Sequence, residues 1–161
     1  MGRMKGRYFR TGFSLIELLI VIALIAIVAA FAVPVWQNYA ANSNLKAAAR
    51  EVMADLADAK QRAVEENLDV YRMTFNVVGN SYALSRTDTG VTLWTKSMAD
   101  FGSGISIDSG SPPNFSGGSV VSLRKRGTLS PGNLRLRNGQ GSTATITVNI
   151  TGRTYVQFAM Q

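Results

Sequence analysis

The chain has 161 residues and a net charge of +7, from 17 Lys and Arg against 10 Asp and Glu. It contains no Cys and no His, which excludes disulfides, thiolate chemistry and the commonest general base and metal ligand. The acids of the loops are scattered, and those between residues 51 and 66 belong to a solvated face of mixed charge. We therefore expect no enzymatic activity, no metal site and no cofactor.

The first 36 residues combine a basic leader with a long apolar run. The leader carries four positive charges and no acid, so removing residues 1–12 lowers the net charge from +7 to +3. Only apolar residues follow from Leu18 to Trp36, enough for a helix that crosses the hydrocarbon core of a bilayer, about 30 Å thick. One carboxylate, Glu17, stands at the head of this run.

Two interpretations of this segment rest on general patterns. An ordinary secretory signal would be cut at residues 30–32, so that the mature chain starts at Val33, but its apolar region usually spans about 7–15 residues. A plain membrane anchor fits the length of the run. It leaves Glu17 unexplained, because an acid inside the bilayer costs about 2.5–3.5 kcal/mol on insertion scales.

The segment GFSLIEL, residues 12–18, resembles the cleavage and assembly motif of type IV prepilins and of type II secretion pseudopilins. The resemblance includes the basic leader, the apolar run and Pro34, which stands where pilin helices commonly bend. It implies that a prepilin peptidase cuts after Gly12 and N-methylates Phe13, and that the helix is kinked at Pro34. It also implies that Glu17 neutralises the terminal amine of a neighbouring subunit during assembly.

The position of Glu17 is chemically consistent with this processing. Cleavage before Phe13 creates a positive amine one helical turn from Glu17. Pairing the two charges between neighbours offsets the cost of burying them and sets the register of the subunits. The positive leader predicts a single-pass protein of the bacterial inner membrane, with a cytoplasmic amino terminus and a periplasmic or extracellular head, which later enters a filament.

Residues 37–67 continue the helix of residues 13–36 in amphipathic form. Apolar residues recur there at steps of three and four, and the remaining positions carry charges of both signs. Asn67 is the expected end of the helix. The predicted apolar stripe consists of Leu45, Ala48, Val52, Leu56, Ala59 and Ala63.

Residues 68–161 predict a β-rich head. The hydrophobic period changes from 3.6 to 2, and about seven short strands are expected. A segment around 102–119, rich in Gly, Ser and Pro, is predicted as a flexible surface loop with one short strand near residues 105–107. The fold class is therefore α+β, with the helix packed on an antiparallel sheet or sandwich. The seven strands are expected at 71–77, 81–86, 91–96, 120–123, 134–137, 143–150 and 154–158.

The head looks like the GspH/FimT group of minor pseudopilins and minor pilins, through its β-rich length, its Arg126-Gly127 turn and its late Gly152-Arg153 pair. This resemblance implies a subunit that assembles through its helix into a type II secretion pseudopilus or a type IV pilus, at or near the tip. Its partners would be other subunits, the assembly platform and the prepilin peptidase. A major pilin that builds the bulk of a fibre is one alternative.

A second alternative is DNA binding. After Asp108 the chain has no acid but six basic residues. Such a patch can grip a phosphate backbone, and some FimT-type minor pilins bind DNA through a carboxyl-terminal Gly-Arg-x-Arg motif, of which Gly152-Arg153 keeps only the first Arg. A solvated face with charged edges explains the same residues without DNA. The six are Arg124, Lys125, Arg126, Arg135, Arg137 and Arg153.

Overall fold

The computed structural model describes residues 14–161. The predicted leader, Gly12 and Phe13 therefore lie outside the described residues. The chain divides into two compact units, one up to Gln37 and one from Asn38 onwards. A single long helix, α1 (Leu15–Glu65), contributes to both units.

The amino-terminal unit contains the apolar part of α1. The backbone N–H of Glu17 donates to the backbone carbonyl of Ser14 at 3.1 Å and to its hydroxyl Oγ at 3.2 Å, so Ser14 caps the helix. All the residues from 15 to 37 are exposed. Pro34 lies inside the helix, and a kink at this residue stays a prediction.

The second part of α1 carries the buried stripe that the periodicity predicted. All six predicted positions are buried, and Ala49 joins them. Four of the seven are alanines, whose small side chains let the helix approach the sheets closely. Asn67 adopts a left-handed conformation, with φ of 54°, and Leu68 N–H donates to the Ala63 carbonyl at 3.1 Å. This Schellman arrangement ends α1 at Glu65, and the predicted stop residue, Asn67, is its left-handed cap.

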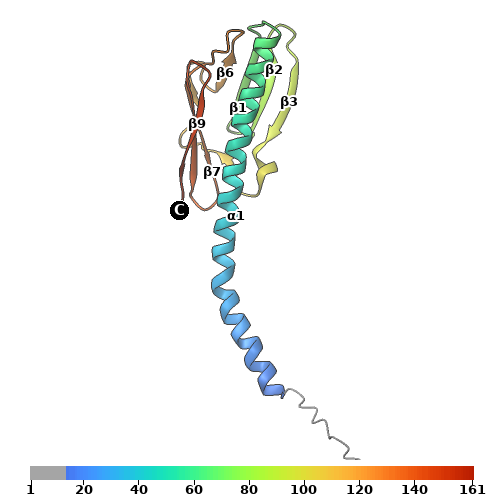
Figure 1. Ribbon diagram of the computed structural model, residues 1–161, viewed down its shortest axis with the longest axis vertical. Coiled ribbons are helices and arrows are strands. Elements are labelled where there is room, and N and C mark those ends of the chain that lie inside the picture. Colours follow the sequence, from blue (N-terminus) through green and yellow to red (C-terminus); the bar gives the residue numbers. More distant parts are fainter. Residues whose placement is uncertain (1–13) are drawn as a thin grey trace, which may run out of the picture. The chain divides into compact units, whose positions relative to one another are not determined.

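Two antiparallel sheets pack with α1 around one core. The first sheet has the order β3-β2-β1-β6, and its first three strands follow one another along the chain. In Figure 1, β2 and β3 lie on one side of α1, and β7 (Gly132–Arg137) and β9 (Thr154–Ala159) lie on the other. The strands of the first sheet are β1 (Tyr71–Asn76), β2 (Ser81–Arg86), β3 (Thr92–Ser97) and β6 (Val120–Leu123).

The second sheet has the order β4-β7-β8-β9, and β5 also pairs with β7. A short 3-10 helix, η1 (Met98–Phe101), links β3 to β4. The result is an α+β fold with one long helix on antiparallel sheets, which confirms the predicted class. The strands are β4 (Ser106–Ile107), β5 (Asn114–Phe115), β7 (Gly132–Arg137), β8 (Thr143–Val148) and β9 (Thr154–Ala159).

The segment 102–119 differs from its prediction. It forms two short strands, β4 and β5, where one was expected, and the described residues contain nine strands in all. Ile105, Ile107 and Phe115 are buried, so the segment contributes to the core and is more than a surface loop. The backbone of this segment passes very close to β7. If Gly132 carried a side chain, its Cβ would lie 2.1 Å from the Asn114 carbonyl oxygen, so only glycine fits there. The flexibility of this segment stays a prediction.

Polar contacts join the first sheet to α1. The Tyr82 hydroxyl donates to the Asp55 carboxylate at 2.6 Å, and Lys96 Nζ donates to Glu51 at 2.7 Å and to Asp55 at 2.8 Å. Burial and the bond to Asp55 both raise the pKa of Tyr82, which keeps its hydroxyl neutral. These contacts connect β2 and β3 to one face of the helix.

Both ends of the β9 segment are also connected to α1. Near its beginning, Lys60 Nζ donates to the Gly152 carbonyl at 3.2 Å. Beyond its end, Asn42 Nδ2 donates to the Gln161 carbonyl at 3.3 Å. Between these two contacts lie about 27 Å of helix and about 30 Å of extended chain, so β9 runs alongside α1 in the opposite direction.

Candidate assembly surface

The apolar part of α1 presents its hydrophobic side chains to the outside. Among the described residues, α1 is the one helix that is long and apolar enough to cross a membrane, and none of its most apolar window is buried within the chain. Leu15 is 81% exposed, Phe31 74% and Trp36 73%. A helix that is apolar on all sides requires burial by something outside its own chain, such as lipid or neighbouring helices.

Glu17 is the one acid of this surface and lies in the first turn of α1. Its side chain is exposed, and its carboxylate has no hydrogen bond or ion pair with residues 14–161. An acid in the first turn interacts favourably with the helix dipole. Ser14 and Glu17 also have the spacing of a capping box, so the sequence of the motif contains a helix-start signal as well. The carboxylate is therefore held at the helix terminus and is open to an external partner.

The basic residues that form one cluster in the sequence are divided between the two sheets. Arg124, Lys125 and Arg126 occupy the turn that follows β6, where the Asp69 carboxylate accepts a hydrogen bond from the Lys125 backbone N–H at 2.8 Å. The turn that contains Gly152 and precedes Arg153 lies against this basic turn. A Cβ built on Gly152 would be only 2.4 Å from the backbone carbonyl oxygen of Gly127. Four of the six residues are therefore near one another.

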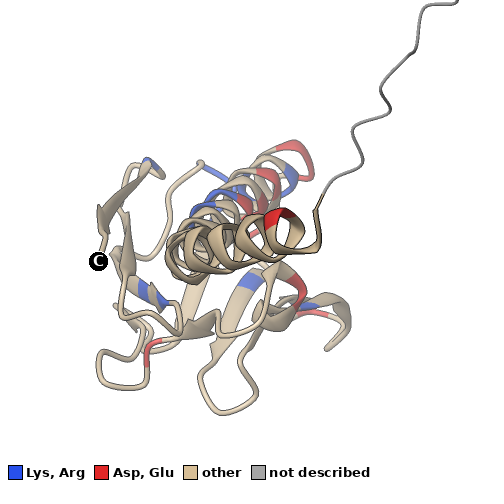
Figure 2. Cartoon of the chain, turned by 90° about the horizontal axis from the view of Figure 1, so that it is seen from below, with Lys and Arg blue, Asp and Glu red and all other residues tan. Residues whose placement is uncertain are grey.

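Arg135 and Arg137 lie elsewhere, on β7 of the second sheet. Leu134 and Leu136 are buried and the two arginines are exposed, as the alternation predicted. Arg137 is five residues from the start of β7, about 17 Å along the strand. One guanidinium nitrogen of Arg135 is 4.0 Å from a carboxylate oxygen of Asp108, and this ion pair partly neutralises the positive charge of Arg135. Figure 2 shows Lys and Arg distributed over α1 and the sheets, with acids among them, and not gathered on one strand face.

The described residues also bear on metal chemistry. In the range 14–161, no group of three or more Asp, Glu, Cys or His is placed to hold a metal ion.

Comparisons with protein families match two parts of the chain. Residues 9–33 match the model of the prokaryotic N-terminal methylation motif. Residues 48–152 match the model of the type II transport protein GspH. The first match covers Glu17 and most of the apolar part of α1, and the second covers α1 from residue 48 onwards and every strand except β9.

Fimbrial proteins are among the relatives of known name. A type IV major fimbrial protein FimA of Dichelobacter nodosus is 33% identical over 113 residues, which are 58% of this chain and 68% of that protein. A fimbrial protein of Pseudomonas aeruginosa is 44% identical over 59 residues, 37% of this chain. The matched part spans 38% of the length of that second relative.

Among solved structures, the type IV minor pilin FimU of Pseudomonas aeruginosa has a similar fold. The TM-score is 0.57 with 14% identity, over 72% of this chain and 90% of FimU. At this identity the likeness concerns the fold alone. Together with the two family models, it means that the chain belongs to the GspH family of type II transport proteins and carries the N-terminal methylation motif of type IV pilin-like proteins.

Proposed function

We propose that this protein is a low-abundance subunit that assembles through the amino-terminal part of α1 into a type II secretion pseudopilus or a type IV pilus, at or near its tip. Membership of a family of structural subunits agrees with this role and with the absence of His and Cys. The observation that carries the proposal is the apolar surface from Leu15 to Gln37, whose residues are all exposed.

The proposed assembly begins with cleavage after Gly12 and N-methylation of Phe13. The new positive amine would then lie one turn from Glu17 of its own chain and pair with Glu17 of a neighbour. Support comes from the match to the methylation motif and from the exposed carboxylate of Glu17. Before assembly the same helix would anchor the protein in the inner membrane, with the head outside the cytoplasm.

Mass spectrometry of the mature amino terminus tests the processing step. We expect a chain that begins at N-methylated Phe13, and a chain that keeps residues 1–12 when the prepilin peptidase is absent. A start at Val33 would instead establish an ordinary secretory signal. An uncut chain in the presence of the peptidase would establish a plain membrane anchor.

Quantification of subunits in sheared filaments tests the minor role. We expect a few copies for each filament, concentrated at one end when labelled through the head. A share that grows in proportion to filament length would identify a major fibre subunit. DNA binding stays a second candidate, supported by the exposed Arg135 and Arg137 on β7.

A further inference from the structure

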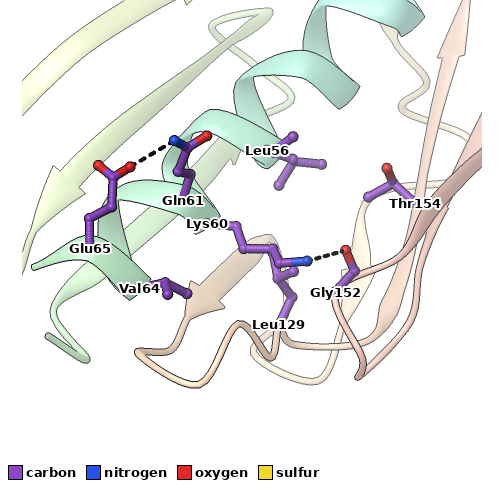
Figure 3. A pocket seen from close by; sticks show the side chains of 9 residues that line it. Leu56, Lys60, Gln61, Val64, Glu65, Leu129, Gly152 and Thr154 are labelled. Atoms are coloured by element: carbon purple, nitrogen blue, oxygen red, sulfur yellow. Dashed lines mark hydrogen bonds between the residues drawn. The ribbon is translucent and has the colours of Figure 1, made fainter. Parts of the chain in front are cut away.

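A groove lies between the carboxyl-terminal half of α1 and the beginning of β9. Its volume is about 490 Å³. Figure 3 shows Lys60 reaching across it to the Gly152 carbonyl, with Thr154 on the β9 side and Leu56 on the helix side. The main lining residues are Leu56, Lys60, Val64, Leu129, Gly152 and Thr154.

The strand that borders this groove is a free sheet edge. β9 pairs with β8 and with no other strand of the described chain. The Asn149 N–H donates to the Arg153 carbonyl at 2.9 Å, and the register continues through Thr147–Tyr155 and Thr145–Gln157. Since hydrogen-bonded pairs alternate in antiparallel sheets, β9 directs the N–H and C=O groups of residues 154, 156 and 158 away from β8.

The two edges of the second sheet differ in how they are protected. On the β7 side the edge consists of β4 and β5, which have two residues each. Very short edge strands are a common protection against further pairing. β9 has six residues, TYVQFA, without a charge or a proline. Its edge therefore has the properties of a strand that can accept another one.

Lys60 gives this groove its charge. Its ammonium group is bonded to the Gly152 carbonyl, and it forms no ion pair with a carboxylate of residues 14–161. The nearby acid of the groove, Glu65, accepts a hydrogen bond from Gln61 at 2.7 Å on the adjacent turn of the helix. Arg153 adds a second positive charge at the start of β9. A half-buried ammonium beside apolar side chains favours a carboxylate as its partner.

The geometry points to a docking site for an extended acidic peptide segment of a partner subunit. The segment would add to the free edge of β9 as a further strand, and one of its carboxylates would bind Lys60 Nζ. Main-chain bonds to residues 154, 156 and 158 would supply affinity, and Lys60 would select the charge and fix the register. The inference rests on the proposed assembly function only in naming the partner as another subunit.

The test uses the full chain in detergent micelles and two synthetic peptides. Both are blocked seven-residue peptides of alternating valine and threonine, one beginning with glutamate and the other with lysine. We expect the glutamate peptide to bind about tenfold more tightly than its lysine twin in fluorescence anisotropy. Its binding should slow amide hydrogen exchange at residues 154, 156 and 158. Equal binding of both peptides, or no binding, would overturn the inference.

Three variants separate the contributions. Lys60→Glu should reverse the preference between the two peptides, and Lys60→Gln, which retains a donor for the Gly152 carbonyl, should abolish it. Lys46→Glu makes the same charge change at an exposed position of the same helix and should leave the preference intact. If Lys46→Glu changed the preference between the peptides as much as Lys60→Glu does, the preference would depend only on the net charge of the protein, and the role of Lys60 would be overturned.

Thr154→Pro tests the strand addition itself. It removes an N–H that β8 does not use, at the first residue of a strand, where proline is tolerated. We expect weaker binding of both peptides with an unchanged circular dichroism spectrum. Unchanged binding would contradict pairing at this edge. These outcomes do not depend on cleavage at Gly12 or on filament formation, so failure here is distinguishable from failure of the proposed assembly.

Discussion

The two parts of α1 differ in the exposure of their apolar side chains. From residue 38 onwards, the buried apolar residues form one stripe, and Leu45, Val52 and Leu56 are almost fully buried against the chain's own sheets. Up to residue 37, apolar residues occupy every face and all of them are exposed. One stripe is enough to hold a head, whereas a fully apolar surface requires partners on all sides.

This difference assigns the stability of the head to the second part of α1 and the proposed assembly to the first part. Substitutions in the second part of α1 should change the free energy of unfolding of the head, and they should affect assembly only through that loss of stability. Substitutions in the first part should change assembly and leave the head unaffected.

The largest effect is expected for Glu17→Lys. It replaces the carboxylate proposed to neutralise a neighbour's amine with a second positive charge, and an unpaired buried charge costs about 3–5 kcal/mol. Incorporation into sheared filaments should fall below detection, while the unfolding midpoint of the head stays the same. Asp58→Lys is the matched control at an exposed position of α1 outside the groove beside β9. Normal incorporation of Glu17→Lys would refute the neutralising role.

A matched pair of leucine truncations tests the division directly. Leu56→Ala should lower the free energy of unfolding of the head by about 2–5 kcal/mol, because it leaves a cavity under the sheets. Leu24→Ala removes the same atoms from an exposed position and should change it by less than about 0.5 kcal/mol. Chemical denaturation of the full chain in detergent measures both. Similar losses in the two variants would mean that the apolar part of α1 also stabilises the head.

Tyr82→Phe should cost about 1.5–3 kcal/mol at neutral pH, since it removes a hydrogen bond to a carboxylate. The sign of its pH dependence follows from the raised pKa of Tyr82, caused by burial and then by Asp55. The fold favours the neutral hydroxyl, so this stability is complete below the unfolded-state pKa of about 10 and is lost as the pH rises above it. Unfolding measured between pH 8 and 12 should therefore show a shallower alkaline loss in the variant.

Part of the alkaline loss should remain in Tyr82→Phe. Desolvation lowers the pKa of Lys96, but its bonds to Asp55 and Glu51 outweigh this, and the net pKa is raised. Stability from charged Lys96 is likewise present below its unfolded-state pKa and lost at higher pH. A variant whose alkaline loss is as steep as that of the wild type would show that Tyr82 titrates alike in both states.

The smallest effect concerns the head's surface charge. The DNA-binding alternative predicts that the double substitution Arg135→Ala and Arg137→Ala weakens DNA retardation and lowers the salt slope by about 1 for each lost phosphate contact. The pair Arg124→Ala and Arg126→Ala is the control in the other cluster. Unchanged retardation in the first variant would leave these arginines as a solvated strand face.

Local patterns allowed much of the fold to be predicted. The stripe from Leu45 to Ala63, the end of α1 at Asn67 and the alternation of β1 depend on neighbours in the sequence. β8 was predicted to reach Ile150 but ends at Val148, because residues 149–152 form a turn closed by Gly152 in a left-handed conformation. β5 was not predicted, since two residues carry no periodicity and pair only because Gly132 admits them.

The separation of the basic residues could not be predicted. Arg124 and Arg135 follow closely in the sequence, but β6 pairs with β1 while β7 pairs with β8. Which sheet a strand joins depends on contacts between residues far apart in the chain, and charge patterns contain no information about it. The groove beside β9 could not be predicted for the same reason, because it forms only when Lys60 and Gly152, far apart in the sequence, come into contact.

The two bonds that connect β9 to α1 have a mechanical consequence. In the proposed filament, axial tension would reach each head through its helix. Because Asn42 and Lys60 bind opposite ends of an extended segment alongside the helix, a pull along the helix axis loads both contacts together. Contacts loaded in parallel share the force, whereas contacts that are peeled break one after another. The head should therefore resist axial traction better than sideways force, a difference that force spectroscopy along the two directions can measure.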